Sequence, residues 1–135
     1  MRAAYDRVIG VICLAGIAVT HLTDLPEKIE EAPYMAVLFC GLIAASAGLG
    51  TVLAIGRDTT TVWPLAGALG SLPLIGYLLS RSVGLPQLED HVGDWLNPAG
   101  VASLVFELVL VVLSTTHLLR ARRGSPRGTP AAHRM

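Results

Sequence analysis

The chain has 135 residues, of which 53% are hydrophobic and only 15% are charged, well below the roughly 25% of charged residues usual in soluble domains. It contains 10 basic and 10 acidic residues, so its formal net charge is zero, and no basic surface for binding nucleic acid is expected. This composition predicts a multi-pass membrane protein of one domain.

Four apolar stretches recur along the chain. Each holds about 20 residues, enough for an α-helix to cross a hydrocarbon core about 30 Å thick. The first stretch is expected to be a retained span, because Thr20 to Thr23 offer no small-x-small cleavage pattern for a signal peptide. The predicted spans are residues 8–25, 34–55, 62–80 and 98–119.

Two longer connections join these spans. Residues 24–33 form the first exposed connection, with Pro26 suited to the start of a short helix. In residues 81–97, apolar side chains at helical spacing alternate with acidic ones, which predicts a short amphipathic helix in the membrane interface, starting at Pro86. Asn97 is then expected to cap the final span.

The predicted fold class is therefore all-α. It is an integral membrane four-helix bundle with a short interfacial amphipathic helix between the third and fourth spans. Residues 1–123 are expected to form this transmembrane domain. Residues 124–135 combine turn-forming residues with no periodicity, so they are expected to be a disordered cytoplasmic tail.

Basic residues are distributed unevenly among the polar segments. With both termini in the cytoplasm, the inner segments hold eight arginines, whereas the outer loops hold only Lys28 and Arg81. The positive-inside rule therefore predicts a plasma (inner) membrane protein with both termini cytoplasmic. The inner residues are Arg2, Arg7, Arg57, Arg120, Arg122, Arg123, Arg127 and Arg134.

The final span carries one acidic residue, Glu107, near its middle. A carboxylate at this depth is costly in lipid, so it is expected to face other helices or water. It could serve as a proton or ligand site, or as a hydrogen-bonding link between helices. His21, with Asp24 on the same helix face, lies nearer the outer surface, so its direct contact with Glu107 is expected to be marginal. The expected bridges are a water molecule, Thr20, Ser46, Ser71 or Tyr77.

Acidic residues gather in the outer loops. Imidazole and carboxylate groups can bind a divalent transition metal, and carboxylates alone suit Ca²⁺. The alternative is a solvated acidic surface that enforces topology, since no motif with metal-ligand spacing is present. The candidate metal ligands are Glu27, Glu30, Glu89, Asp90, His91 and Asp94.

No cofactor motif and no nucleophile–base pair is evident, so the chain is expected not to be an enzyme. The first functional hypothesis is a structural or accessory subunit of a membrane complex, in contact with the lipid bilayer and either a second copy of itself or a partner subunit. The alternative is a transporter or binding protein for a cation or a proton-coupled solute. That protein would use Glu107, His21 and the acidic outer loops.

Overall fold

The computed structural model describes residues 1–57 and 59–124, and over these residues the chain is helical, without a β-strand. Four of its helices are long and apolar enough to cross a membrane, which confirms the predicted all-α class with four such helices. The elements are α1 (Arg2–Glu31), α2 (Pro33–Ala54), α3 (Thr59–Ser82), the short 3₁₀-helix η1 (Glu89–His91) and α4 (Pro98–Gly124). The predicted disordered tail lies outside the described residues, apart from Gly124.

Helix α1 is longer than the predicted first span. It continues through Pro26 to Glu31, so the expected connection over residues 24–33 shrinks to Ala32 between two helices. The short helix expected from Pro26 is thus the last part of α1. A membrane helix can accommodate an internal proline when nearby groups satisfy the freed backbone. Here the last turn is also held by Lys28, which donates to Glu31 three residues later at 2.7 Å.

The loop between α3 and α4 holds no amphipathic α-helix. Only Glu89–His91 forms a turn of 3₁₀-helix. Gly84 and Gly93 adopt positive φ angles of 80° and 86°, and Gln87 has a φ of 66°. Residues in this left-handed region interrupt a right-handed helix, so the loop folds back on α3, where the Gly93 N–H donates to the Arg81 carbonyl at 2.9 Å. The predicted cap of α4 is confirmed, because Asn97 Oδ1 accepts from the Gly100 N–H at 3.1 Å.

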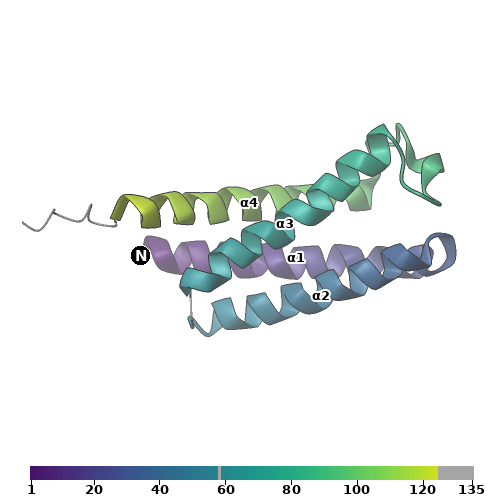
Figure 1. The fold of residues 1–135 in the computed structure, drawn as a ribbon. Helices are drawn as coiled ribbons and strands as arrows, with labels where there is room; N and C mark the ends of the chain where they lie inside the picture. Colours follow the sequence, from purple (N-terminus) through teal and green to yellow (C-terminus); the bar gives the residue numbers. More distant parts are fainter. Residues whose placement is uncertain (58, 125–135) are drawn as a thin grey trace, which may run out of the picture.

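The other three long helices are arranged around α1. Helices α2 and α4 lie on either side of it, and α3 starts beside the end of α2 and runs away from it toward α4 (Figure 1). Of the helix pairs α1–α2, α1–α4, α3–α4 and α2–α3, the last consequently has the sparsest packing in the described chain. The N-terminus, the α2–α3 connection and the end of α4 share one end, called the arginine end here. The α1–α2 junction and the loop before α4 form the other, the loop end (Figure 1).

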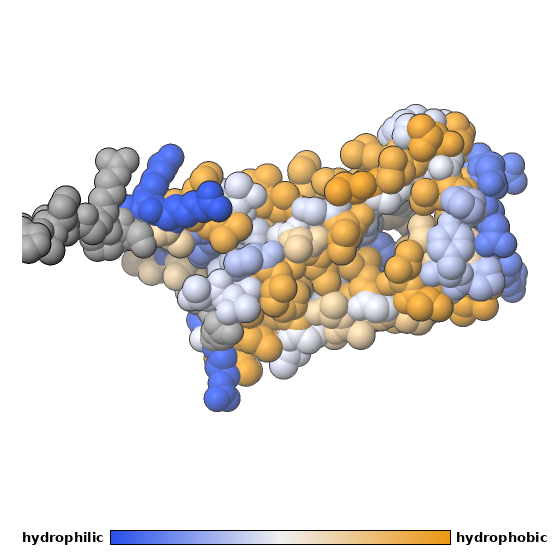
Figure 2. Space-filling view, in the orientation of Figure 1, coloured by the Kyte–Doolittle hydropathy of each residue, from blue (hydrophilic) through white to orange (hydrophobic). Residues whose placement is uncertain are grey.

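The core lies toward the arginine end. Its side chains come from all four long helices and include Leu14, Leu53, Trp63 and Leu110, each at most 3% exposed. The outer surface between the two ends is largely hydrophobic, and blue hydrophilic side chains gather at the ends (Figure 2). Among described residues, Val37 and Leu72 are 72% and 69% exposed. A surface of this kind suits hydrocarbon better than water.

Candidate functional site

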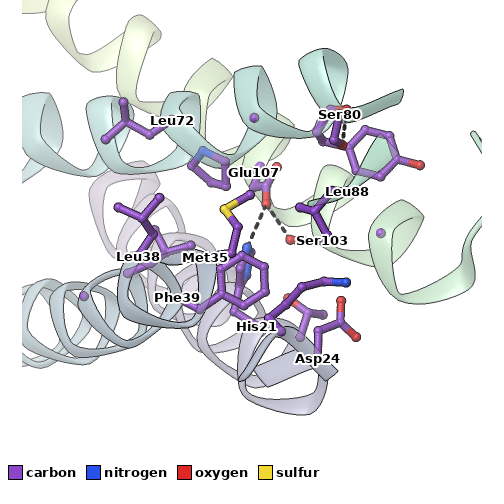
Figure 3. Close-up of a pocket in the computed structure, with 18 of the residues that line it drawn as sticks. His21, Asp24, Met35, Leu38, Phe39, Leu72, Ser80, Leu88, Ser103 and Glu107 are labelled. Carbon is purple, nitrogen blue, oxygen red and sulfur yellow. Dashed lines mark hydrogen bonds and ion pairs between the residues drawn. The ribbon is translucent and has the colours of Figure 1, made fainter. Parts of the chain in front are cut away.

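A cavity of about 590 Å³ lies between the four helices toward the loop end (Figure 3). This volume is in the range of small-molecule pockets, which is roughly 300–1,000 Å³. Its wall is mainly apolar and contains side chains such as Leu38, Phe39, Leu69 and Leu72. Two predicted site residues, Glu107 of α4 and His21 of α1, meet across it, and Asp24 lies nearer the loop end.

Glu107 is almost completely buried, with an exposure of 2%. The Ser103 hydroxyl, one turn earlier on α4, donates a hydrogen bond to Glu107 Oε1. The second oxygen, Oε2, is buried and has no hydrogen-bond partner among the described residues. A buried polar atom without a partner is rare and costly, so this oxygen marks a position where a donor is missing.

His21 approaches Glu107 from the opposite helix and is 7% exposed. Its Nδ1 lies 2.9 Å from the Ile17 carbonyl oxygen. Because a carbonyl only accepts, Nδ1 must carry the proton of that hydrogen bond. In the neutral ring Nε2 is then a bare acceptor, and it lies 4.0 Å from Glu107 Oε1. Two acceptor groups therefore face each other unless a proton or a donor lies between them.

None of the side chains predicted to bridge these two groups has a hydrogen bond to His21 or Glu107 among the described residues. Ser71 donates to the Gly67 carbonyl at 2.7 Å, and Tyr77 donates to the Trp95 carbonyl at 2.9 Å. Ser46 is buried without a partner for its hydroxyl among described residues, and Thr20 donates to carbonyls of its own helix. The partner that sequence reasoning missed is Ser103. Its spacing of four residues from Glu107 places both side chains on one helix face, a signal that was available.

Charged residues close the loop end of the cavity. Lys28 of α1, which is 8% exposed, donates to Glu27 and Glu31 at 2.7 Å each, and its Nζ lies 3.2 Å from His91 Nε2. Arg81 of α3 donates to the His91 carbonyl at 3.3 Å. We call Lys28, Arg81 and His91 the charged cap. It joins α1, α3 and the loop across this end of the cavity.

The predicted metal ligands come together only in part. Among described residues, Glu27, Glu31 and His91 place ligand atoms within 4.8 Å of one another. Lys28 Nζ contacts all three of these side chains and supplies a positive charge where a metal ion would lie. Of the predicted ligands, Glu30, Glu89, Asp90 and Asp94 are not part of this group.

A second polar cluster lies at the arginine end. Asp6 of α1 is 3.0 Å from His117 Nε2 and 3.4 Å from an Arg120 guanidinium nitrogen, both on α4. Trp63 of α3 stacks on the His117 ring. Asp6, Trp63, His117 and Arg120 form what we call the arginine-end cluster. Sequence reasoning could not pair Asp6 with His117, because they are 111 positions apart.

No family model and no solved structure matches this chain. The curated proteins it matches are each described as a "Probable methylmalonyl-CoA mutase small subunit", from Mycobacterium bovis and from two strains of Mycobacterium tuberculosis. Each is 36% identical over 117 residues, which cover 80% of this chain. The chain spans only 18% of the length of these relatives.

Proposed function

We propose that this chain is a small multi-pass membrane protein that binds a proton-exchanging or cationic solute in the cavity between its helices. The observation that carries the proposal is Glu107. A carboxyl group that is 2% exposed, with one oxygen lacking a partner, faces a cavity large enough for a small molecule. Ionisable residues inside membrane helices are costly, and function is the usual reason that they persist.

The proposed setting is the plasma (inner) membrane, with both termini in the cytoplasm. Support comes from the largely hydrophobic surface between the two ends on the face that Figure 2 shows. It comes also from the arginines in the segments at the end that holds the N-terminus and the end of α4 (Figure 1). A reporter that is active only in the cytoplasm, fused after Met135, is expected to be active. Activity solely of a reporter for the outside would contradict this orientation.

The chemistry of binding follows from the two facing acceptors. His21 Nε2 and Glu107 Oε1 are 4.0 Å apart, too far to share a proton directly. A ligand N–H group within hydrogen-bond distance of both side chains would turn their opposition into hydrogen bonds. Ser103 holds Oε1, which leaves Oε2 for the ligand. A cationic donor fits best, because hydrogen bonds between charged partners are about twice as strong as neutral ones.

We propose binding rather than catalysis because of the order of these groups. In serine hydrolases the histidine lies between the nucleophilic hydroxyl and the carboxylate. Here the carboxylate of Glu107 lies between Ser103 and His21. The histidine therefore does not accept the serine proton, and the arrangement suits a held ligand or proton.

A second candidate is an accessory subunit of a larger membrane complex. The sparse packing between α2 and α3 favours it, since another helix could cover that side. The matched relatives are themselves described as subunits. In this case Glu107 would act only as a link between helices.

Infrared difference spectroscopy in lipid nanodiscs separates these candidates. As the pH is varied, we expect a protonated-carboxyl band that is absent from Glu107→Gln and shifted in His21→Gln. Asp94→Asn, which removes an exposed loop carboxylate, is the control and should leave that band in place. If no such band titrates and Glu107→Gln only lowers the folded yield, the binding proposal is wrong and the packing role stands.

A further inference from the structure

We infer that the ligand of this cavity is a membrane-soluble primary or secondary amine that enters from the bilayer between α2 and α3. This inference rests on the proposed function and adds the chemical class of the ligand and its route. It combines the side on which the cavity opens, the closure of the other end, and the hydrogen-bonding groups at the polar wall.

The cavity opens toward the gap between α2 and α3. Next to it lies a second, wholly apolar groove between these two helices. Three residues, Ala45, Leu69 and Leu72, line both the groove and the cavity. Figure 2 shows this face hollowed between hydrophobic side chains toward the loop end. An apolar path therefore leads from the lipid-facing surface into the cavity.

The loop end offers no comparable path. The charged cap crosses it, with Lys28 and His91 3.2 Å apart and Arg81 bonded to the His91 carbonyl. Both Lys28 and Arg81 are only 8% exposed. A solute arriving from water would have to separate these buried bonded groups, whereas an apolar solute already in the bilayer meets only hydrocarbon side chains.

His21 and Glu107, which form the polar wall of the cavity, determine which head group the ligand can carry. His21 Nε2 and Glu107 Oε2 both accept hydrogen bonds, so a ligand that offers only acceptors leaves them unsatisfied. An amine offers several donors and, when protonated, a charge opposite to that of the Glu107 carboxylate. The other ionisable groups that line the cavity are Asp24, Lys28, Tyr77, Arg81 and His91.

The apolar wall accommodates the rest of the ligand. Leu38, Leu42, Leu69 and Leu72 surround space that widens beside two glycines. A Cβ atom added to Gly41 of α2 or to Gly76 of α3 would meet no atom within 4 Å. These positions therefore leave room for an alkyl or aryl chain, and a larger side chain that starts there should take up part of the same space.

The experiment measures binding of octylamine, octanol and ethylamine to the protein in nanodiscs, with empty nanodiscs to subtract partitioning into lipid. We expect octylamine to bind at least about tenfold more tightly than either of the other two, which is about 1.4 kcal/mol. Ethylamine tests the apolar chain, and octanol tests the amine. Equal binding of octanol overturns the amine assignment, and equal binding of ethylamine overturns the membrane-soluble class.

Two cavity-filling variants test the placement. Gly76→Leu and Gly41→Leu, on facing helices, should each weaken octylamine binding about tenfold or more. Ala44→Leu is the matched control, because Ala44 is exposed on α2 and lines neither the cavity nor the groove. Gly48→Phe in the groove should slow association. If both cavity variants and the groove variant bind normally, the route and placement are wrong.

The outcomes also separate this inference from the function on which it rests. If Glu107→Gln abolishes octylamine binding while the cavity-filling variants bind normally, the proposed function stands and the position of the chain is wrong. If the cavity-filling variants abolish binding while Glu107→Gln binds normally, Glu107 is not the ligand site and the proposed function fails.

Discussion

Trp63 and His117 stack face to face, with ring centroids 4.1 Å apart and ring planes within 8° of parallel. His117 also lies 3.0 Å from Asp6, without a well-directed hydrogen bond. Three helices, α1, α3 and α4, therefore meet at this one imidazole. Because lipid supplies no hydrophobic force between helices, such specific contacts account for much of the cohesion of a membrane bundle.

Replacing His117 should loosen the arginine end. His117→Ala removes the stacking on Trp63 and the contact with Asp6, and we expect it to lower the free energy of unfolding by about 1–2 kcal/mol. Asp6→Asn should cost less, and a double-mutant cycle between the two should give a coupling of about 0.5–1 kcal/mol. Unfolding in sodium dodecyl sulfate provides the measurement. Arg122→Gln, at an exposed position of the same helix end, is the control, and an equal loss there would argue against a specific role.

Ser103 should matter for binding rather than folding. Ser103→Ala removes the hydroxyl that donates to Glu107 Oε1, which frees the carboxyl group to rotate and leaves a second buried oxygen unsatisfied. We expect octylamine affinity to fall about tenfold, with a modest loss of stability. Ser114 lies on the same helix as Ser103 and donates to the Trp63 carbonyl of α3. Ser114→Ala should therefore lower stability and leave octylamine affinity unchanged. The reverse pattern would disprove the assigned role of Ser103.

Gly16 should be intolerant of even one methyl group. A Cβ atom at this position would lie 2.6 Å from the Phe106 ring, so in Gly16→Ala either that ring or the two helices must shift. We expect a loss of about 1–3 kcal/mol, measured by the same unfolding assay. Adding Phe106→Leu should recover part of it. Gly41→Ala, beside open space, should cost nothing, because alanine favours a helix more than glycine does.

Lys28 should suppress metal binding at the loop end. Its ammonium group contacts Glu27, Glu31 and His91, the three side chains closest to a ligand set. Lys28→Met should therefore increase Zn²⁺ affinity at least about tenfold in equilibrium dialysis. Glu30→Gln, outside this group, should leave the affinity unchanged. Tight Zn²⁺ binding by the unmodified chain would contradict this competition.

The presence of four long helices was predictable because each is a long apolar run, and an α-helix forms its backbone hydrogen bonds within itself. The residues at which the helices begin and end were less predictable. Pro26 favours a helix start in isolation, yet the surrounding residues and the Lys28–Glu31 bond continue α1 past it. The amphipathic helix predicted from Pro86 does not form because Gln87 and Gly93 have positive φ angles. Their conformations depend on how the loop returns to α3.

The site was predictable in its residue types and less so in its contacts. Glu107 was identified by its cost in lipid, which depends on sequence alone. Its contact with His21 was expected to be marginal, and the two groups lie 4.0 Å apart, beyond hydrogen-bond distance. Depth counted along straight, upright helices could not give this separation more closely, since it ignores tilt. Ser103 could have been found by helical spacing. The Asp6–His117 pair depends on which helices are neighbours, and periodicity carries no information about that.

Helix α1 is fastened near both ends to the second half of the chain, through Asp6 at one end and Lys28 at the other. These residues are 22 positions apart, about 33 Å along the helix axis. These two contacts should therefore resist thermal motions that separate α1 from α4 or from the loop. Among the described residues, the side between α2 and α3 has one such bond, at the loop end, where the Tyr34 hydroxyl donates to the Pro86 carbonyl at 2.7 Å. Packing between α2 and α3 is otherwise sparse, so in the proposed membrane setting thermal motion should separate these helices first and bring lipid tails to the Glu107 carboxyl group.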